Sequence, residues 1–263
     1  PSGSEGGLLM DTLINVRQVS YAYHTLSGET MALSDITFSV GEGEFLAIVG
    51  PSGCGKSTLL SLLSGLMEPE QGTIEIRQDT KEGKTQIGYM LQKDHLFEWR
   101  TVYRNVILGL EIQNRMTPEN LSHVDQLLEE YGLSRFKNAR PSELSGGMRQ
   151  RAALIRTLAL DPRLLLLDEP FSALDYQTRL NVCDDVYQII RKEKKTAVLV
   201  THDLSEAISM ADRVLILSSR PATVCKTVEI RFAAEELTPM QRRQAPEFKD
   251  YFNEIWKELN HYA

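Results

Sequence analysis

Short apolar runs separated by turn-forming residues open the chain and predict an antiparallel sheet. From Leu13 to Val40, stretches such as "LINVRQV" and "MALSDITFSV" have strand length and strand patterning. "GEGE" then predicts a turn into "FLAIVG", a wholly apolar segment typical of a strand buried on both faces.

The pattern next changes to helical spacing. Apolar residues recur at intervals that predict an amphipathic or buried helix at Leu59, Leu60, Leu62, Leu63 and Leu66. "EPEQGTIEI" predicts a turn followed by another strand. From Lys93 to about Arg140 the chain is polar and helical in pattern, and Pro141 interrupts it. We therefore interpret residues 93–151 as a small helical subdomain inserted into the core.

Alternating helices and strands follow the insert. A helix through Leu160, the strand "RLLLLDE", a helix around Leu180 to Arg191 and the strand "TAVLVTHD" imply parallel βαβ connections. The pattern therefore predicts an α/β core.

The two ends of the chain differ from this core. "PSGSEGGLL" is Gly/Ser-rich, and we interpret residues 1–9 as a tag or flexible tail, with native sequence from Met10. We assign residues 10–228 to one domain and 229–263 to a C-terminal helical tail. One face of the last helix carries Phe248, Tyr251, Phe252, Ile255, Trp256 and Leu259. Such a face more often packs on a core than binds a partner.

Composition narrows the functional classes. The chain has 263 residues, 42% of them hydrophobic, which suffices for a full core. A net charge of −7 argues against a protein that coats nucleic acid. Cys54, Cys183 and Cys225 lack zinc or disulfide spacing, which indicates a reduced compartment, the cytoplasm. We see no apolar run of the about 18–20 residues that a membrane helix needs, and no secretory leader. We therefore expect any membrane role to come through a partner.

"GPSGCGKST" is the strongest chemical signal. It fits G-x-x-x-x-G-K-[ST] between a predicted strand and a predicted helix, and comprises Gly50, Pro51, Ser52, Gly53, Cys54, Gly55, Lys56, Ser57 and Thr58. Its glycines let backbone N–H groups surround phosphate oxygens, and the helix adds its positive end. Lys56 is suited to the β- and γ-phosphates of a nucleotide, and the Ser57 hydroxyl to Mg²⁺.

A second predicted strand ends in two carboxylates. "LLLLDEP" places Asp168 and Glu169 at its carboxyl end, where ligands bind in α/β sheets. Because neighbouring strand residues point to opposite sides, we expect different roles: Asp168 holds Mg²⁺ and Glu169 polarises an attacking water. Without the phosphate loop, an acidic strand end turning to solvent would be the simpler interpretation.

Three further residues are candidates with simpler alternatives. His202 ends the strand "VLVTHD" and suits a contact to the γ-phosphate or to the catalytic carboxylate, although a lone histidine is usually a cap or a core residue. Gln92 suits a contact to Mg²⁺ and water, or is a polar loop residue. Tyr21 and Tyr23 share a strand face, where one ring stacks on a purine or both simply pack across strands. The pattern leaves these alternatives open.

The motifs occur in a characteristic order. "GPSGCGKST", "LSGGMRQ", "LLLLDEPFSALD" and "VTHD" resemble the nucleotide-binding subunit of an ABC transporter, from about Leu13 to Val228. The resemblance implies a P-loop NTPase (RecA-like) α/β core with an antiparallel β subdomain and the inserted α-helical subdomain. It also implies ATP hydrolysis with Mg²⁺.

The resemblance implies roles for individual residues. The signature of one subunit contacts the ATP of the other in a head-to-tail dimer, and matches Leu144, Ser145, Gly146, Gly147 and Gln150. A serine hydroxyl and free N–H groups at a helix start suit this anion contact. Tyr23 matches the adenine-stacking aromatic, Gln92 the Q-loop and His202 the switch histidine. Glu169 matches the catalytic glutamate. The D-loop matches Ser172, Ala173, Leu174 and Asp175.

The branch of the family is indicated by "LQKDHLFEWRTVYRNVILGL" and "VLILSSRPATV". These resemble importer subunits for nitrate, sulfonate and taurine, although Glu98 and Ala222 depart from that group's common proline and glycine. The resemblance implies transmembrane permease subunits, an extracytoplasmic solute-binding protein, and a peripheral place at the cytoplasmic face of the membrane. Leu96, Phe97 and Trp99 are candidate permease contacts, or else the core of the insert.

The sequence patterns of other proteins in this family differ from those of this chain. DNA-repair relatives carry a very long coiled coil and ribosome-acting relatives fuse two ATPase domains, and we see neither pattern, so we expect no nucleic-acid partner. A silent partner in a heterodimer conflicts with intact Glu169 and His202. An exporter subunit remains possible, as do a homodimer and a dimer with a paralogue.

Overall fold

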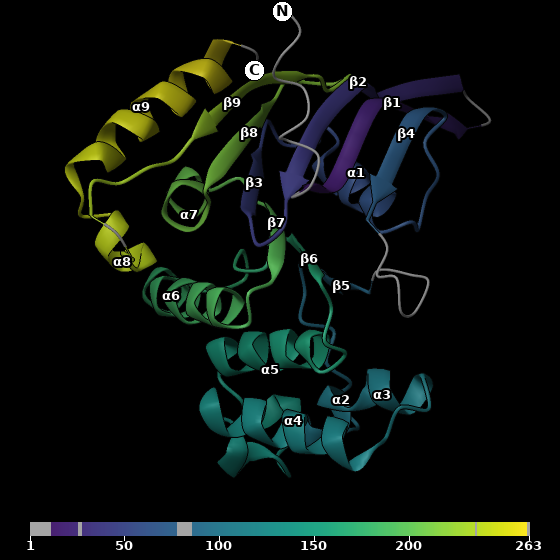
Figure 1. The fold of residues 1–263 in the computed structure, drawn as a ribbon, viewed down its shortest axis with the longest axis vertical. Coiled ribbons are helices and arrows are strands. Elements are labelled where there is room, and N and C mark those ends of the chain that lie inside the picture. The colour runs from purple at the N-terminus through teal and green to yellow at the C-terminus, as the bar shows by residue number, and fades with distance from the viewer. Residues whose placement is uncertain (1–11, 26–27, 78–85, 235, 262–263) are drawn as a thin grey trace, which may run out of the picture.

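The computed structural model describes residues 12–25, 28–77, 86–234 and 236–261 (Figure 1). The predicted tail and Met10 lie outside these ranges. Within them the strands form two sheets, and helices pack around the larger one. The α/β class predicted from the sequence is confirmed.

The smaller sheet is antiparallel. It has the order β2-β1-β4 and consists of β1 (Thr12–Thr25), β2 (Gly28–Gly41) and β4 (Gln71–Ile76). Ile14 and Val16 are fully buried while Asn15 between them is partly exposed. The alternating side chains of these strands thus cover the core with one face of the sheet.

The larger sheet has the order β5-β6-β7-β3-β8-β9. Its strands are β3 (Phe45–Val49), β5 (Ile87–Met90), β6 (Leu164–Asp168), β7 (Thr196–Val200), β8 (Arg213–Leu217) and β9 (Val224–Glu229). The first five in this spatial order run parallel, and β9 pairs antiparallel with β8. The apolar runs of β3, β6 and β7 are buried throughout, as expected for parallel strands covered on both faces.

Helices connect and cover the strands. The helices that precede β6 are α1 (Lys56–Leu63), α2 (Val102–Val106), α3 (Leu108–Ile112), α4 (Pro118–Glu130), the 3₁₀ turns η1 (Ser134–Phe136) and η2 (Pro141–Glu143), and α5 (Gly146–Leu158). The helices that follow β6 are α6 (Tyr176–Lys192), α7 (Leu204–Met210), α8 (Pro239–Arg242) and α9 (Pro246–His261). Helices α2 to α5 lie together at one end of the molecule, remote from the antiparallel sheet (Figure 1).

Local sequence sets the starts of several helices. Ser145, Asp175 and Asp203 each accept a hydrogen bond from a backbone N–H in the first turn of α5, α6 and α7. Such caps stabilise a helix start by about 1 kcal/mol each. The Asp203 cap directly follows His202, so it helps to orient the turn after β7.

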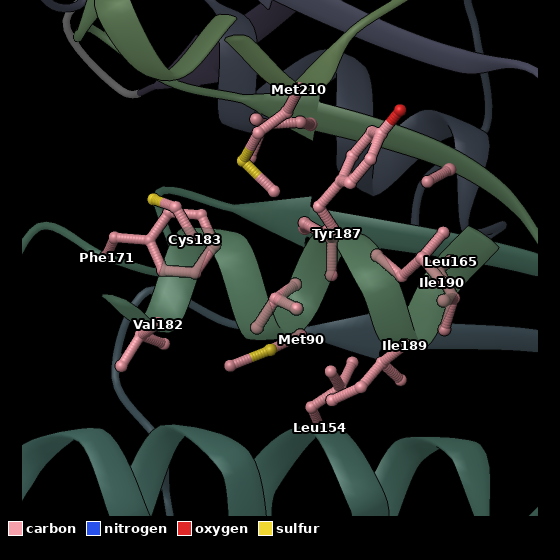
Figure 2. Packing of buried hydrophobic residues seen from close by; sticks show 14 of the residues in the cluster. Met90, Leu154, Leu165, Phe171, Val182, Cys183, Tyr187, Ile189, Ile190 and Met210 are labelled. Atoms are coloured by element: carbon pink, nitrogen blue, oxygen red, sulfur yellow. The ribbon is translucent and has the colours of Figure 1, made fainter. Parts of the chain in front are cut away.

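Two apolar clusters sandwich the larger sheet. Alternate residues of β3 divide between them: Phe45 and Ala47 face one cluster, and Leu46 and Ile48 face the other. Figure 2 shows part of the first cluster, where Leu154 of α5 lies below Ile189 of α6, and Met90, the last residue of β5, lies above α5. Helix α1 and the antiparallel sheet contribute to the second cluster. The helical insert is therefore packed onto the core through α5 and α6.

Two apolar predictions were wrong in detail. Helix α1 ends at Leu63, and Leu66 is 71% exposed because Gly65, with φ +74°, turns the chain out of the helix. On α9, Ile255 is buried while Trp256 is 54% exposed. An α-helix turns 100° per residue, which places Trp256 beside the buried Ile255 at the exposed edge of the apolar face, while Phe248, Tyr251, Phe252 and Leu259 pack against the core as predicted.

No helix in the described ranges is both long enough and apolar enough to span a membrane.

Candidate functional site

The candidate site lies at the carboxyl edge of the larger sheet. Strands β3, β5, β6 and β7 run parallel, so the residues that follow them meet at one edge. A cavity of about 490 Å³ opens there, lined by Ser52, Gly53, Gly55, Lys56, Ser57, Thr58, Glu169, His202 and Arg220. The parallel topology thus assembles motifs that are more than 100 residues apart in the chain.

The phosphate loop joins β3 to α1. Gly55 has φ +128°, and a Cβ there would lie 2.9 Å from Leu33 Cδ2, so glycine is required on both counts. Lys56 is buried, and its Nζ donates to the carbonyl oxygens of Gly50 and Pro51 at 2.9 Å each. The loop therefore places an ammonium group and the start of α1 at one point, which suits an anionic ligand.

Cys54 belongs to this loop but points away from the cavity. Its side chain is 1% exposed and lies in the core with Leu33 and Leu59. Burial raises the pKa of its thiol. Its N–H donates to the Pro51 carbonyl at 3.3 Å. Any role for Cys54 in ligand binding would therefore come from its backbone.

Ser57 and Asp168 form the candidate cation site. The Ser57 hydroxyl donates to Asp168 Oδ1 at 3.2 Å across the gap between α1 and β6. Burial raises the pKa of Asp168, and the hydrogen bond from Ser57 opposes this shift. Among the described residues there is no group of three or more His, Cys, Asp or Glu suited to a metal ion. A hydroxyl, one carboxylate and phosphate oxygens fit Mg²⁺, which usually takes few protein ligands.

Glu169 connects three loops. Its Oε2 lies 3.1 Å from His202 Nδ1 and accepts a hydrogen bond from Gln92 Nε2 at 3.3 Å. The Ser172 hydroxyl donates to the Glu169 carbonyl oxygen at 3.0 Å. β6 ends at Asp168, and Glu169 adopts φ +44°. The left-handed backbone of Glu169 therefore sets the direction of its side chain, and the alternation of side chains along a strand does not extend to this residue.

Tyr23 lies beside the phosphate loop. Its hydroxyl hydrogen-bonds with Thr58 Oγ1 at 2.9 Å, and its ring packs edge-on against Tyr21 with centroids 5.2 Å apart. The side chain is still 38% exposed. Both tyrosines belong to β1, so this is a ring contact along one strand, and it leaves part of the Tyr23 ring accessible next to the loop.

The second predicted phosphate contact lies elsewhere. Ser145 caps α5 by accepting from Met148 N at 3.4 Å, and it is exposed, as is Gly146. In the part of the chain that the structure describes, the cavity lining includes no residue from Leu144 to Gln150. Leu144 and Gln150 are themselves buried. The predicted signature therefore does not line the cavity that holds Lys56 of the same chain.

The predicted D-loop packs against this signature. A Cβ on Gly146 would lie 3.0 Å from Leu174 Cδ2, so these two loops are in close contact. Asp175 caps α6 by accepting from Thr178 N at 3.1 Å. Ser172, at the other end of the loop, is the residue that contacts Glu169 and Gln92. The predicted D-loop therefore contacts both the predicted signature and the side chains around Glu169.

Arg220 lines the cavity but was given no role from the sequence. It follows β8, which neighbours β3 in the sheet. Its motif, "RPATV", was used only to assign the chain to a branch. The available signal was its position after a predicted strand, which places it at the same edge as the other site residues.

A buried carboxyl next to the site is expected to make the stability of the fold depend on pH. Glu206 of α7 is 3% exposed and accepts a hydrogen bond from Thr201 Oγ1 at 2.6 Å. Arg179 Nη1 lies 3.9 Å from Glu206 Oε1. The negative charge of Asp203 raises the pKa of Glu206, and the positive charges of Arg179 and Arg243 lower it. Burial raises the pKa of Glu206 from 4.5 to about 7. Because the folded state binds this proton more tightly, the stabilisation is full below pH 4.5 and is lost as pH rises to about 7.

We expect Glu206→Gln to remove this pH-dependent contribution, which is about 3 kcal/mol between the two pKa values. The amide oxygen of glutamine still accepts the bond from Thr201 and carries no charge. Denaturant unfolding of both proteins from pH 4.5 to 8 measures the difference. Glu68→Gln, at an exposed position, is the control with the same change of charge. Parallel pH profiles for wild type and Glu206→Gln would contradict the prediction.

The fold and the site together define a class. A phosphate loop on a central parallel strand, with an adjacent strand ending in Asp168 and Glu169, is the arrangement of a P-loop ATPase. The chain belongs to the ABC transporter family, whose model matches residues 33–172. It is an ATP-binding subunit of this family and an ATP hydrolase.

Relatives and solved structures agree with this assignment. The chain is 46% identical over 250 residues to an uncharacterized ABC transporter ATP-binding protein of Bacillus subtilis, covering 95% of this chain and 96% of that protein. It is 40% identical over 233 residues to a nitrate import ATP-binding protein of Synechocystis, covering 87% and 88%. A dimeric post-hydrolysis state of an ATP-binding cassette bound to ADP and Pi is 30% identical, with a TM-score of 0.70, and covers 83% of this chain and 99% of that chain. The predicted resemblance to the nitrate, sulfonate and taurine group is confirmed.

Proposed function

We propose that this chain powers import of a small solute through a membrane permease, as one of two ATPase subunits in a head-to-tail dimer. The observation that carries the proposal is the separation of two phosphate-binding elements on one chain. The loop at Lys56 meets Glu169 and His202 in one cavity, whereas Ser145 lies outside it and is exposed. A second copy, or a paralogue, is needed to bring a signature to each loop.

Within the cavity the side chains divide the chemistry. Lys56 and the loop N–H groups bind the phosphates, and Tyr23 stacks on the adenine through its exposed ring. The Glu169 carboxylate accepts a proton from the attacking water. His202 and Gln92, at 3.1 Å and 3.3 Å from this carboxylate, hold it in position. This arrangement supports in-line attack on the terminal phosphate.

We further propose that Ser57 and Asp168 hold Mg²⁺, with Gln92 as a third oxygen donor. All three provide oxygen atoms, and Asp168 is the only carboxylate among them, which matches the few protein ligands that Mg²⁺ takes. When bound, Mg²⁺ neutralises charge on the β- and γ-phosphates.

The surface next to the Q-loop suits a permease contact. A cavity of about 360 Å³ is lined by Lys93, Asp94, His95, Leu96, Arg149, Gln150 and Ala173. Arg149 braces its wall through hydrogen bonds to Asp94 and Glu98 at 2.8 Å each. Trp99 is 73% exposed and its ring lies 4.7 Å from that of Phe97. We propose that this pair contacts a helix of the permease.

The three predicted permease contacts are not equivalent. Leu96 is 6% exposed and belongs to a buried apolar cluster, which favours the second of the two interpretations, a residue of the core of the insert. The reason is local: Leu96 N donates to Asp94 Oδ1 at 3.0 Å, and this tight turn directs the leucine inward.

We expect Trp99→Ala to reduce recovery of the permease with this chain at least tenfold, which is about 1.4 kcal/mol or more, because exposed aromatics dominate such interfaces. ATPase activity of the isolated chain should be unchanged, because Trp99 lies outside the nucleotide cavity. Trp256→Ala, at the exposed tryptophan of α9, is the matched control and should recover the permease normally. Equal recovery with Trp99→Ala would remove the aromatic pair from the interface.

The test of the proposed function uses the Glu169→Gln chain, tagged and produced in its own cell. Membranes are extracted in detergent with ATP and Mg²⁺, and co-purifying proteins are identified. A polytopic membrane protein together with a solute-binding protein is expected. Recovery alone, or with ribosomes or DNA, would overturn the transport role, and a membrane protein that exports its substrate would overturn import.

A further inference from the structure

Among the described residues that line the nucleotide cavity, Arg220 is the one for which the motifs supply no role. Among the described side chains that line the cavity, only Lys56 and Arg220 are permanently cationic. The Lys56 ammonium is engaged by two carbonyl oxygens of its own loop. Glu169 adds a negative charge to the same cavity. A polyphosphate entering this cavity therefore gains from a second cation.

The turn that carries Arg220 is held in place by its neighbours. Ala222 N donates to Ala32 O at 2.9 Å, and Ser34 N donates to Ala222 O at 2.9 Å. Thr223 N donates to Ser218 Oγ at 2.9 Å and so closes the turn. The backbone on both sides of Arg220 is thus bonded to β2 and to itself, which fixes the position from which the side chain extends.

The Arg220 guanidinium is itself available. The residue is exposed, and within the described ranges it makes no ion pair or hydrogen bond. Burial raises the pKa of Cys54, and the positive charges of Lys56 and Arg220 both act against this shift. The field of Arg220 therefore reaches the interior of the phosphate loop.

We infer that Arg220 binds the phosphate chain of the nucleotide, reaching it from the turn that follows β8, the neighbour of β3 in the sheet. The planar guanidinium donates several N–H bonds in a fixed fork, which matches phosphate oxygens. Arg220 is thus a nucleotide-binding residue supplied by the β8 turn. The inference rests on the proposed function, because it concerns the same ATP.

The test compares Arg220→Gln, which removes the charge, with Arg220→Lys, which retains it. ATPase kinetics should show KM for ATP raised about tenfold in Arg220→Gln, as expected for loss of an exposed charge-assisted bond, with kcat within about twofold. Arg220→Lys should retain most of the affinity. The effect should shrink in high salt, because the contact is solvent-accessible. Arg135→Gln, on the exposed surface of the insert, is the control for loss of one positive charge.

Three results would overturn the inference. The first is an unchanged KM together with an unchanged Kd for ATP, measured by calorimetry on the monomer. The second is equal damage by Arg220→Lys and Arg220→Gln, with thermal unfolding of both as in wild type. The third is loss of the ATP-dependent dimer without loss of monomer affinity, which would assign Arg220 to the subunit interface. Wild-type hydrolysis, measured alongside, tests the proposed ATPase function separately.

Discussion

Glu169→Gln is expected to bind ATP as wild type does and to hydrolyse it about 10²–10⁴-fold more slowly, the range for loss of a general base. Glutamine has the same shape, so it can keep its contacts to Gln92 and His202. It cannot accept a proton from the attacking water. With hydrolysis blocked, ATP should hold two chains together, and the dimer should accumulate.

Single-turnover hydrolysis measures the rate, and gel filtration with ATP and Mg²⁺ measures the dimer. Glu68→Gln, an exposed glutamate with the same change of charge, should hydrolyse ATP normally and remain monomeric. Normal turnover in Glu169→Gln would remove this carboxylate from its assigned role. The acid that polarises water would then have to be sought elsewhere at the carboxyl edge of the sheet.

Ser145→Arg is expected to leave the affinity of the monomer for ATP unchanged and to lower hydrolysis at least about 100-fold. Ser145 lies outside the cavity that holds Lys56, so the chain's own phosphate loop is not disturbed. At a shared site, the arginine side chain would occupy the space that the nucleotide of the second chain needs. Loss of the helix cap costs only about 1 kcal/mol and should not unfold α5.

A double variant separates this effect from a simple loss of activity. Adding Ser145→Arg to Glu169→Gln should abolish the ATP-dependent dimer while calorimetry still shows ATP binding. Ser142→Arg is the matched control, because Ser142 is an exposed serine in η2 only three residues earlier. Survival of hydrolysis in Ser145→Arg would exclude the head-to-tail arrangement.

Long-range organisation followed from simple patterns. The apolar runs of β3, β6 and β7 could be recognised as buried strands because parallel strands covered on both faces cannot tolerate polar side chains. Their order along the chain, with helices between them, implied a parallel sheet whose carboxyl ends meet. A parallel sheet of this kind brings the phosphate loop, Asp168 and His202 to the same edge, so their proximity could be predicted from the sequence.

Side-chain direction was less accessible to the sequence. Leu66 and Trp256 fit apolar helical spacing, yet both are exposed, and Leu96, for which the sequence left a core position and a permease contact open, is buried. The spacing of a helix says which residues share a face, and it does not say where the helix ends or how a turn redirects the chain. Gly65 turns the chain out of helix α1, and the hydrogen bond from Leu96 N to Asp94 Oδ1 closes the turn that directs Leu96 inward.

Local composition and periodicity thus sufficed for the α/β class, the phosphate loop and the two acids, because these depend on backbone geometry within a few residues. The left-handed turn at Glu169, the approach of Gln92 and His202 to its carboxylate, and the entry of Arg220 into the cavity depend on contacts between distant segments. Such contacts arise when β5, β6, β7 and β8 pair side by side. Sequence spacing does not encode them, because the distance between two residues in a fold is set by packing.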